Sequence, residues 1–127
     1  MEIPETRAPG PCNVEEALTQ LPGPWQPHRL ASLNDHEVKV VSLPGEFVWH
    51  THPGTDELFH VIQGEVTIQR RDGNVVPGPQ EVFVVPRGVE HCPVPTEGAQ
   101  AIPIERAGAI NTGDAGGDLT SPLRELP

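Results

Sequence analysis

Turn signals recur about every 8–12 residues through the middle of this chain, and they separate short runs of β-branched residues. They run from Pro44-Gly45 to Glu97-Gly98, and between residues 38 and 104 there are 13 Val and 4 Ile against only 2 Leu. Short β-branched segments with regular turns are typical of a β sandwich or barrel. We therefore predict an all-β domain, in which Asp72-Gly73 forms the clearest hairpin.

The length of 127 residues fits a single domain, since compact domains cluster at about 100–150 residues. We predict a flexible N-terminus over residues 1–12, one domain over 13–106 and a loosely ordered, glycine-rich tail over 107–127. A short helix is expected after Asn13, because Asn13 and Glu16 form a capping-box pattern. Pro22 is expected to end that helix, and its leucine face to pack on the β domain.

The charge and hydropathy of the chain exclude several classes of function. The net charge is −10, and the chain has only eight Lys and Arg, so nucleic-acid binding is not expected. No apolar run exceeds the four residues 82–85, so neither a membrane span nor a signal-peptide core is expected. We predict a cytoplasmic protein whose two cysteines, Cys12 and Cys92, are free thiols.

Three of the six histidines lie in an arrangement that can carry chemistry. His50 and His52 are two residues apart, so in a strand both point to the same face. After a turn at residues 53–54 the chain can return antiparallel and place Glu57 opposite them. His91 comes much later in the chain, and a shared interior face would bring it to the same pocket.

Burying a carboxylate and several imidazoles without partners would cost several kcal/mol, and a divalent cation removes that cost. Imidazole and carboxylate ligands suit Fe(II), Mn(II), Ni(II), Cu(II) or Zn(II). The alternative interpretation is that these are solvated histidines on the wet face of a strand. The spacing favours the metal site, because histidines of one parity are followed by a carboxylate after a turn.

Two motifs in this region resemble those of the cupins. The first is Gly45, His50-Thr51-His52, Glu57 and Gly64, and the second is Pro86-Arg87-Gly88-Val89-Glu90-His91. The resemblance covers residues 45–95 closely, with motifs at 45–64 and 78–95. It extends more loosely over 34–113 to small single-domain cupins of the mannose-6-phosphate-isomerase-like kind.

The resemblance implies a double-stranded β-helix, or jelly roll, around one divalent transition metal, such as Fe, Mn, Ni or Zn. The metal ligands that it implies are His50, His52, Glu57 and His91. Cupins are commonly dimers through sheet contacts, so a homodimer is expected. We expect its contact surface to be a set of residues that parity places on the outer face, namely Phe47, Trp49, Leu58, His60 and Ile62.

The remaining reactive residues have simpler interpretations. His28 and His36 have no partner at metal-ligand spacing, and we predict structural or solvated roles for them. Cys92 has no base placed to activate it, so a thiolate nucleophile is not expected. Arg70 and Arg71 flank the hairpin, and solvated positions are expected there, although either could bind a carboxylate.

Two classes of function remain open. Four protein ligands leave two positions on an octahedral ion, which suits an oxygenase, isomerase or lyase acting on a small molecule. Glu57 would then stay a ligand or act as the catalytic base. The other class is a non-catalytic module that binds or senses a metal or a small metabolite. The inward residues Val48, Phe59 and Val61 offer no second acid or base, which is what this alternative would show, but we favour the protein that acts on a small molecule.

Overall fold

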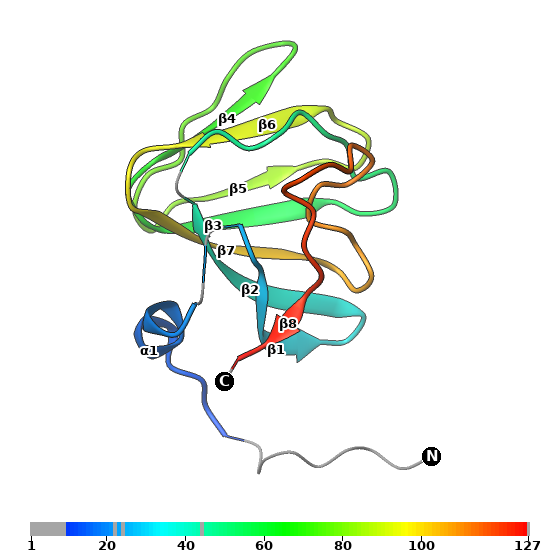
Figure 1. Ribbon diagram of the computed structural model, residues 1–127. Coiled ribbons are helices and arrows are strands. Elements are labelled where there is room, and N and C mark those ends of the chain that lie inside the picture. The colour runs from blue at the N-terminus through cyan, green and yellow to red at the C-terminus, as the bar shows by residue number, and fades with distance from the viewer. Residues whose placement is uncertain (1–9, 22, 24, 44, 127) are drawn as a thin grey trace.

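The computed structural model describes residues 10–21, 23, 25–43 and 45–126, and its strands form two sheets (Figure 1). One sheet has six strands in the order β5-β3-β7-β2-β1-β8, and the other pairs β4 with β6. The strands are β1 (His28–Leu33), β2 (His36–Leu43), β3 (Glu57–Gln63), β4 (Val66–Arg70), β5 (Val82–Val85), β6 (His91–Pro95), β7 (Ala99–Arg106) and β8 (Arg124–Glu125). The only helix in the described residues is α1 (Val14–Thr19), so the predicted all-β fold with one short N-terminal helix is confirmed.

The core lies between the two sheets. In β3 the side chains of Glu57, Phe59 and Val61 are buried and those between them are half-buried, as the predicted alternation requires. β7 lies beside β3 in antiparallel register, with Glu57 opposite Glu105 and Val61 opposite Ala101. The core cluster joins inward side chains of this sheet to Val66 and Ile68 of β4, so both sheets contribute to it.

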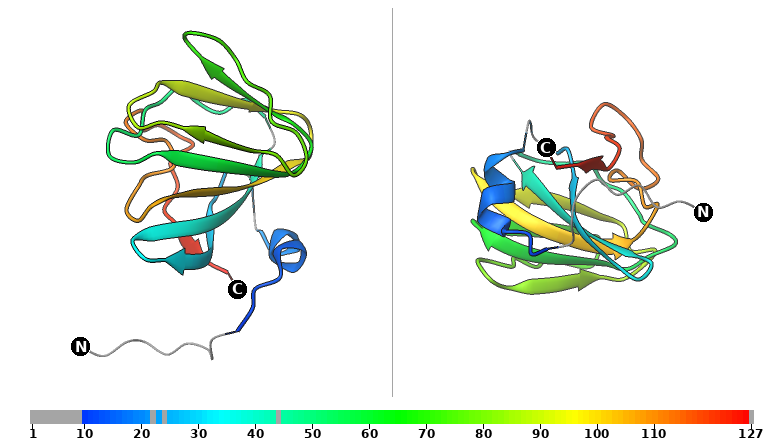
Figure 2. Two further views of the ribbon diagram at one scale, coloured as in Figure 1. Left: turned by 180° about the vertical axis from the view of Figure 1, so that it is seen from behind. Right: turned by 90° about the horizontal axis from the view of Figure 1, so that it is seen from below.

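The helix begins where the capping pattern predicts. The Asn13 side chain accepts a hydrogen bond of 2.8 Å from the backbone N–H of Glu16. α1 packs against β2 at the end of the molecule away from β4 and β6 (Figures 1 and 2). Ala17 is its buried residue, whereas Leu18 is half-buried, so the contact is narrower than the predicted leucine face. Pro22, the expected helix stop, lies outside the described residues.

α1, the one helix in the described ranges, is not long and apolar enough to cross a membrane.

The predicted hairpin at Asp72-Gly73 is present, but its returning arm is short. β4 ends at Arg70, whose carbonyl accepts from the N–H of Gly73 at 3.2 Å. Beyond the turn, Val75 bridges back to Ile68 with hydrogen bonds of 2.7 and 3.1 Å, and the Pro77 carbonyl accepts from the N–H of Val66 at 3.1 Å. The main partner of β4 is β6, paired from Val66↔Pro95 to Arg70↔His91. This pairing starts β6 at His91, one of the predicted metal ligands.

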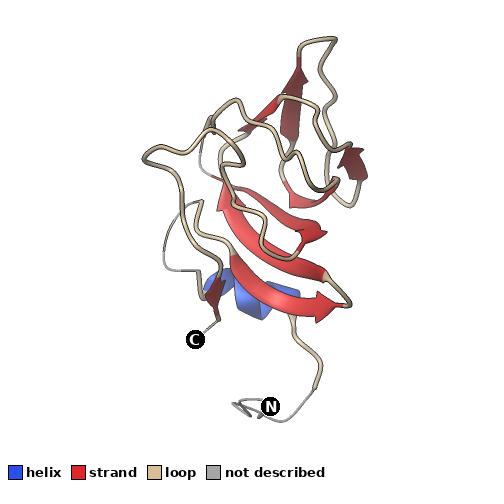
Figure 3. Cartoon of the chain, turned by 90° about the vertical axis from the view of Figure 1, so that its right-hand side faces the viewer, coloured by secondary structure: helices blue, strands red, loops and turns tan. Residues whose placement is uncertain are grey.

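After β7 the chain passes the loops at one side of the sheets, which we call the loop-bearing side. It then returns to β8, which pairs in parallel with β1 (Figures 1 and 3). Asn111 fixes the middle of this segment, because its amide donates to the carbonyls of Trp25 and Leu119 and its oxygen accepts from the N–H of Ser121. Thr112 beside it is fully buried. Residues 107–126 thus have specific contacts, and the predicted loose ordering of 107–127 stays a prediction about their motion.

Candidate metal centre

Two predicted ligands come from segments that hydrogen bond to each other. The backbone N–H of His50 donates to the carbonyl of His91 at 2.9 Å, and the N–H of His91 donates back at 2.9 Å. This bridge places the two imidazoles side by side, with ring centroids 4.3 Å apart. Residues 45–49 before His50 do not form a regular strand, but the Phe47 N–H still bonds to the carbonyl of Pro93 and holds the segment along β6.

The same two histidines have one ring nitrogen committed to the backbone. Nδ1 of His50 bonds to the carbonyl of Val48 at 2.8 Å, and Nδ1 of His91 to that of Val89 at 2.9 Å. A carbonyl only accepts, so Nδ1 carries a proton in both rings, and the neutral form of each ring has its lone pair on Nε2. That tautomer is the one a metal-binding imidazole requires, and the bond orients the ring.

His52 and Glu57 complete the group. His52 follows the bridge, and Glu57 is the first residue of β3, reached through the loop at residues 53–56. Oε1 of Glu57 lies 3.4 Å from Nε2 of His52 and 3.4 Å from Nε2 of His91. One ligand atom from each of His50, His52, Glu57 and His91 lies within 4.8 Å of the others, and all four residues are buried. We call these four residues the tetrad.

Three buried polar atoms of the tetrad lack hydrogen-bond partners. Within the described residues, four buried side-chain atoms have none: His52 Nε2, His91 Nε2, Glu57 Oε1 and Glu105 Oε2. A buried polar atom left unsatisfied costs about 1–3 kcal/mol, so a cluster of them needs an explanation. Three of the four belong to the tetrad, and neutral imidazoles with a carboxylate are a donor set for a divalent transition metal. The residues present therefore fit a metal ion.

The electrostatics of the tetrad separate its members. Burial lowers the pKa of His50 to about 4, so this ring is neutral at physiological pH. Burial also disfavours charge on His52, but the Glu57 carboxylate beside it outweighs burial and raises the pKa of His52 above its ordinary value. Burial alone would raise the pKa of Glu57, yet His52 and His91 bring it far below its usual range. Glu57 is thus the charged ligand.

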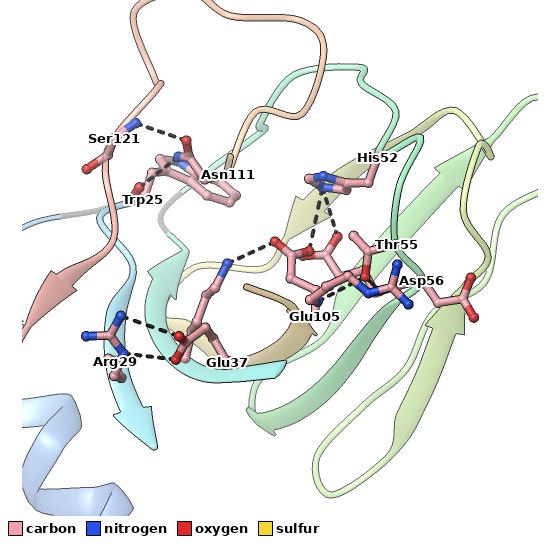
Figure 4. Close-up of polar contacts among 12 residues, drawn as sticks. Trp25, Arg29, Glu37, His52, Thr55, Asp56, Glu105, Asn111 and Ser121 are labelled. Atoms are coloured by element: carbon pink, nitrogen blue, oxygen red, sulfur yellow. Dashed lines mark hydrogen bonds and ion pairs between the residues drawn. The ribbon is translucent and has the colours of Figure 1, made fainter. Parts of the chain in front are cut away.

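Two charged residues beside the tetrad were not predicted from the sequence. Glu105 of β7 is 1% exposed and Lys39 of β2 is 4% exposed, and the Lys39 ammonium donates to Glu105 Oε1 at 2.9 Å. The other oxygen of Glu105, Oε2, lies 3.9 Å from His52 Nε2 (Figure 4). Burial, and then the charge of Glu57, raise the pKa of Glu105 to about 8. The expectation that the interior holds no second acid or base beside Glu57 is therefore wrong.

Three carboxylates lie in register across neighbouring strands of the six-stranded sheet. Glu105 is paired with Glu57 on one side and with Glu37 of β2 on the other. Glu37 is neutralised by Arg29 at 2.9 Å and also accepts from Ser32 at 2.7 Å. Like charges directly opposite each other destabilise a sheet unless cations offset them. Arg29 and Lys39 supply two such cations, and the tetrad is the place for a third.

An apolar wall closes the other side of the site. Trp25 and Phe47 stack with ring centroids 4.2 Å apart, and Phe47 meets the His50 ring edge-on at 5.5 Å. With Phe59 they line a cavity of about 50 Å³ that also contacts Lys39 and Glu105. The prediction that Phe47 lies on the outer face is wrong, because residues 45–49 are not a regular strand and strand parity does not apply to them.

The other candidates lie away from the tetrad, as predicted. His60 is half-buried on the outer face and bonds to Gln80 at 3.0 Å. His28 Nδ1 bonds to the carbonyl of Gln26, and His36 Nδ1 contacts Asp35. Trp49 and Arg70 are half-buried and Arg71 is exposed, and the Arg71 guanidinium stacks 3.7 Å over the Trp49 ring. Cys92 is buried, and burial raises the pKa of its thiol to about 11, which makes it a poor nucleophile.

The segment after β7 fixes the loop that carries His50 and His52. Thr51, between them, donates its N–H to the Asp114 carboxylate at 2.8 Å, and its carbonyl accepts from the Asp114 N–H at 3.1 Å. Gly113 has φ +55°, and a Cβ there would lie 2.3 Å from the Thr51 carbonyl oxygen. Gly113 thus allows a close backbone approach that no other residue permits.

Comparison with known proteins agrees with this geometry. The model of the cupin domain family matches residues 39–102, half of the chain, so the chain belongs to the cupin family. A cupin-2 domain protein of Shewanella frigidimarina is 37% identical, with a TM-score of 0.68 over 74% of this chain and 91% of that chain. The predicted jelly-roll fold and the resemblance to cupins are confirmed.

Two further matches have lower coverage or lower sequence identity. The uncharacterised protein YdbB of Bacillus subtilis is 36% identical over 49% of this chain and 56% of its own length, so the chain spans little more than half of that relative. Hydroquinone 1,2-dioxygenase, solved in complex with Cd²⁺ and 4-hydroxybenzonitrile, is 16% identical with a TM-score of 0.64. The match covers 76% of this chain and 72% of the dioxygenase, and it shows likeness of fold alone.

Proposed function

We propose that this protein binds one divalent transition metal ion through His50, His52, Glu57 and His91 and acts on a small molecule beside that ion. The observation that carries the proposal is the tetrad's set of buried ligand atoms without hydrogen-bond partners. Structural roles would give these atoms donors or acceptors within the protein, whereas metal ligands keep lone pairs directed at one point.

Three imidazoles and one carboxylate contain no soft thiolate and suit a divalent transition metal, for which we propose Fe, Mn, Ni or Zn. Such an ion, when bound, supplies Lewis acidity toward an oxygen atom of the small molecule. The chain's own residues shape that molecule's surroundings: Phe47 and Phe59 exclude water on one side, and Lys39 and Glu105 provide polar contacts on the other. We assign Glu57 to the ligands, with the base role as its second task if it leaves the ion.

Metal content tests the proposal directly. Protein produced in medium supplemented with Fe, Mn, Ni and Zn is expected to contain close to one transition metal per chain by elemental analysis. His50→Ala combined with His52→Ala is expected to abolish that content, because it removes two of the four ligands. His60→Ala is the matched control, since its imidazole lies on the outer face of β3 and bonds to Gln80.

The same experiment separates the alternatives. Metal-free wild-type protein from every supplement would contradict the proposal. A metal-bound protein that binds small molecules without converting them would favour a binding or sensing module, the second class of function. Circular dichroism of the double variant is expected to stay that of a folded β protein, because the core cluster between the sheets does not include either histidine.

We also propose that two copies associate through the outer face of β3 and β5. Val82 and Val84 of the edge strand β5 are 60% and 43% exposed, and they pair with His60 and Leu58 of β3. An exposed apolar face on an edge strand favours a protein partner. Light scattering is expected to give the mass of a dimer for the wild type and of a monomer for Val84→Glu.

The two cysteines support a proposal for the cellular compartment of the protein. Cys12 is exposed and Cys92 is buried, and both are free thiols in the structure. Free thiols fit a reducing compartment, and we propose the cytoplasm.

A further inference from the structure

Among the described residues that line the cavity beside the tetrad, one buried side-chain polar atom outside the tetrad is left without a partner. The side chains that line this cavity include Trp25, Phe47 and Phe59, with Lys39, Glu105 and Asn111 as the polar groups outside the tetrad. Both amide hydrogens of Asn111 are donated to backbone carbonyls, and its oxygen accepts from the backbone N–H of Ser121. The Lys39 ammonium is engaged with Glu105 Oε1.

Glu105 Oε2 is therefore the buried polar atom of the lining outside the tetrad that has no partner. It is buried, has no hydrogen-bond partner, and lies 3.9 Å from Nε2 of the tetrad residue His52 (Figure 4). Two constraints fix where it points. Lys39 holds the other oxygen at 2.9 Å, and the backbone of Glu105 is in register with Glu57 across β3 and β7. In its ionised form, which a divalent cation in the tetrad would favour, this carboxylate offers an acceptor and no donor.

We propose that Glu105, positioned by Lys39, selects the ligand of this site: Oε2 accepts a hydrogen bond from a hydroxyl group that neighbours the metal-binding oxygen of a small molecule. The inference rests on the proposed function, because it requires a metal ion at the tetrad. The chemical class is thus a small α-hydroxy acid, α-hydroxyketone or vicinal diol. A molecule of the same size without the hydroxyl would leave Oε2 unsatisfied.

The size and lining of the cavity agree with this class. About 50 Å³ is room for only a few water-sized groups, so the part of the ligand that enters is small. Phe47 and Phe59 offer no hydrogen bond, and the Lys39 ammonium is held by Glu105 Oε1, so Glu105 Oε2 is the acceptor that can discriminate. An unpaired buried acceptor discriminates strongly, because a ligand that cannot satisfy it pays the full desolvation cost.

The test uses two carboxylic acids that differ by one hydroxyl. The full-length protein is loaded with Co²⁺, whose visible absorption reports on its ligands, and titrated with glycolate and with acetate. The measured quantity is the ratio of the two dissociation constants. In the wild type glycolate is expected to bind more tightly, and Glu105→Gln is expected to reduce the ratio about tenfold or more, because a hydrogen bond to a charged acceptor is lost.

The affinities for acetate and for glycolate are expected to change in opposite directions. In Glu105→Gln the amide oxygen takes the Lys39 contact and the NH2 group faces the tetrad, so acetate is expected to bind more tightly while glycolate binds less tightly. Lys39→Met is expected to reduce the ratio in the same direction, since it removes the donor that holds Oε1. Glu37→Gln is the matched control, because it removes a buried carboxylate of the same row that is paired with Arg29, and it is expected to leave the ratio unchanged.

The outcomes distinguish this inference from the proposed function. A wild-type protein that takes up no Co²⁺ would refute the metal site itself. A Co²⁺-loaded Glu105→Gln variant with an unchanged ratio would refute only the role of Glu105. Loss of Co²⁺ from Glu105→Gln, measured by elemental analysis, would also overturn the inference, because Glu105 would then be a ligand of the metal and not of the small molecule.

Discussion

At the scale of single residues, protons already occupy part of the site that a metal ion would take. The pKa of His52 lies above its ordinary value because Glu57 is beside it, and the pKa of Glu105 is raised to about 8 by burial and by the charge of Glu57. The proton on His52 offsets the charge of Glu57, and the proton on Glu105 neutralises that carboxyl group. A divalent cation in the tetrad would offset the negative charge of these carboxylates more completely. Metal binding and proton release should therefore be coupled.

We predict that metal binding releases protons in a pH-dependent way. At pH 6 both His52 and Glu105 are protonated in the metal-free protein, so binding displaces a proton from each. The release from Glu105 falls as the pH rises through its pKa of about 8, because less of this carboxyl carries a proton there. His50 contributes nothing in this range, because its pKa is about 4. Calorimetric titration with Zn²⁺ in buffers of different ionisation enthalpy measures the number, and a release that grows with pH would contradict the prediction.

Glu105 should also make the metal-free protein sensitive to pH. Its folded-state pKa of about 8 lies above the ordinary 4.5, so its contribution to stability is fully present below pH 4.5 and is lost as the pH rises through 8. The free energy of unfolding by urea in EDTA is expected to fall from pH 5 to pH 8 more steeply in the wild type than in Glu105→Gln. The difference is on the order of a few kcal/mol at most.

Glu37→Gln provides the control for this measurement. The pKa of Glu37 is lowered: burial opposes the charge, but the hydrogen bonds from Arg29 and Ser32 outweigh it. Its contribution is present above the ordinary pKa and is lost only as the pH falls below 4.5. The variant is expected to keep the wild-type slope between pH 5 and 8. Equal slopes in wild type and Glu105→Gln would show that Glu105 is not the titrating group.

At the scale of elements, strand parity explains both the predictions that held and those that failed. Parity placed Glu57, Phe59 and Val61 inward because β3 is a regular strand. It failed for Phe47, which precedes His50 in an irregular segment where side chains need not alternate. The sequence contains no signal for that irregularity, since it arises from hydrogen bonding of the segment to β6.

The same parity would have located Lys39 and Glu105. Lys39 lies on the same face of β2 as the inward-facing Val41 and Leu43, and Glu105 lies on the same face of β7 as the inward-facing Ala99 and Ala101. Charged residues are expected at the surface, so a prediction from composition places Lys39 and Glu105 outside in spite of their inward parity. What the sequence could not show is that the two strands are adjacent, which makes the two charges partners. Charges at inward positions of two strands are the signal to look for in such chains.

The segment after β7 is an element whose close contact is testable. Gly113→Ala is expected to destabilise the protein by a few kcal/mol, because its Cβ would lie 2.3 Å from the Thr51 carbonyl oxygen. Gly116→Ala is the control, since Gly116 also has positive φ, +66°, but its Cβ would meet nothing within 4 Å. It is expected to cost about 1–2 kcal/mol from backbone strain alone.

Metal affinity gives a second measurement of the same contact. Thr51 lies between His50 and His52, so displacement of its carbonyl moves two members of the tetrad. Gly113→Ala is therefore expected to weaken Zn²⁺ binding in competition with a chelator, whereas Gly116→Ala is expected to leave it unchanged. Equal urea stability and equal Zn²⁺ affinity of the two variants would show that Gly113 and Thr51 are not in close contact in solution.

At the scale of the whole molecule, the tetrad joins parts of the fold that are otherwise linked through the core. Glu57 belongs to β3 of the six-stranded sheet, His91 to β6 of the two-stranded sheet, and His50 and His52 to the loop between β2 and β3. An ion bound to all four would tie the two sheets together at the loop-bearing side. Its effect should therefore extend over the whole domain.

We predict that metal binding raises the melting temperature by roughly 5–15 °C at a free metal concentration about a hundredfold above the Kd, since linkage gives about 2.7 kcal/mol under that condition. EDTA is expected to reverse the shift, and His91→Ala to abolish it. In hydrogen exchange the added protection should appear in both β3 and β6, because the ion would connect them. Protection confined to the loop at residues 45–56 would instead mean that the ion does not bridge the sheets and that His91 is not a ligand.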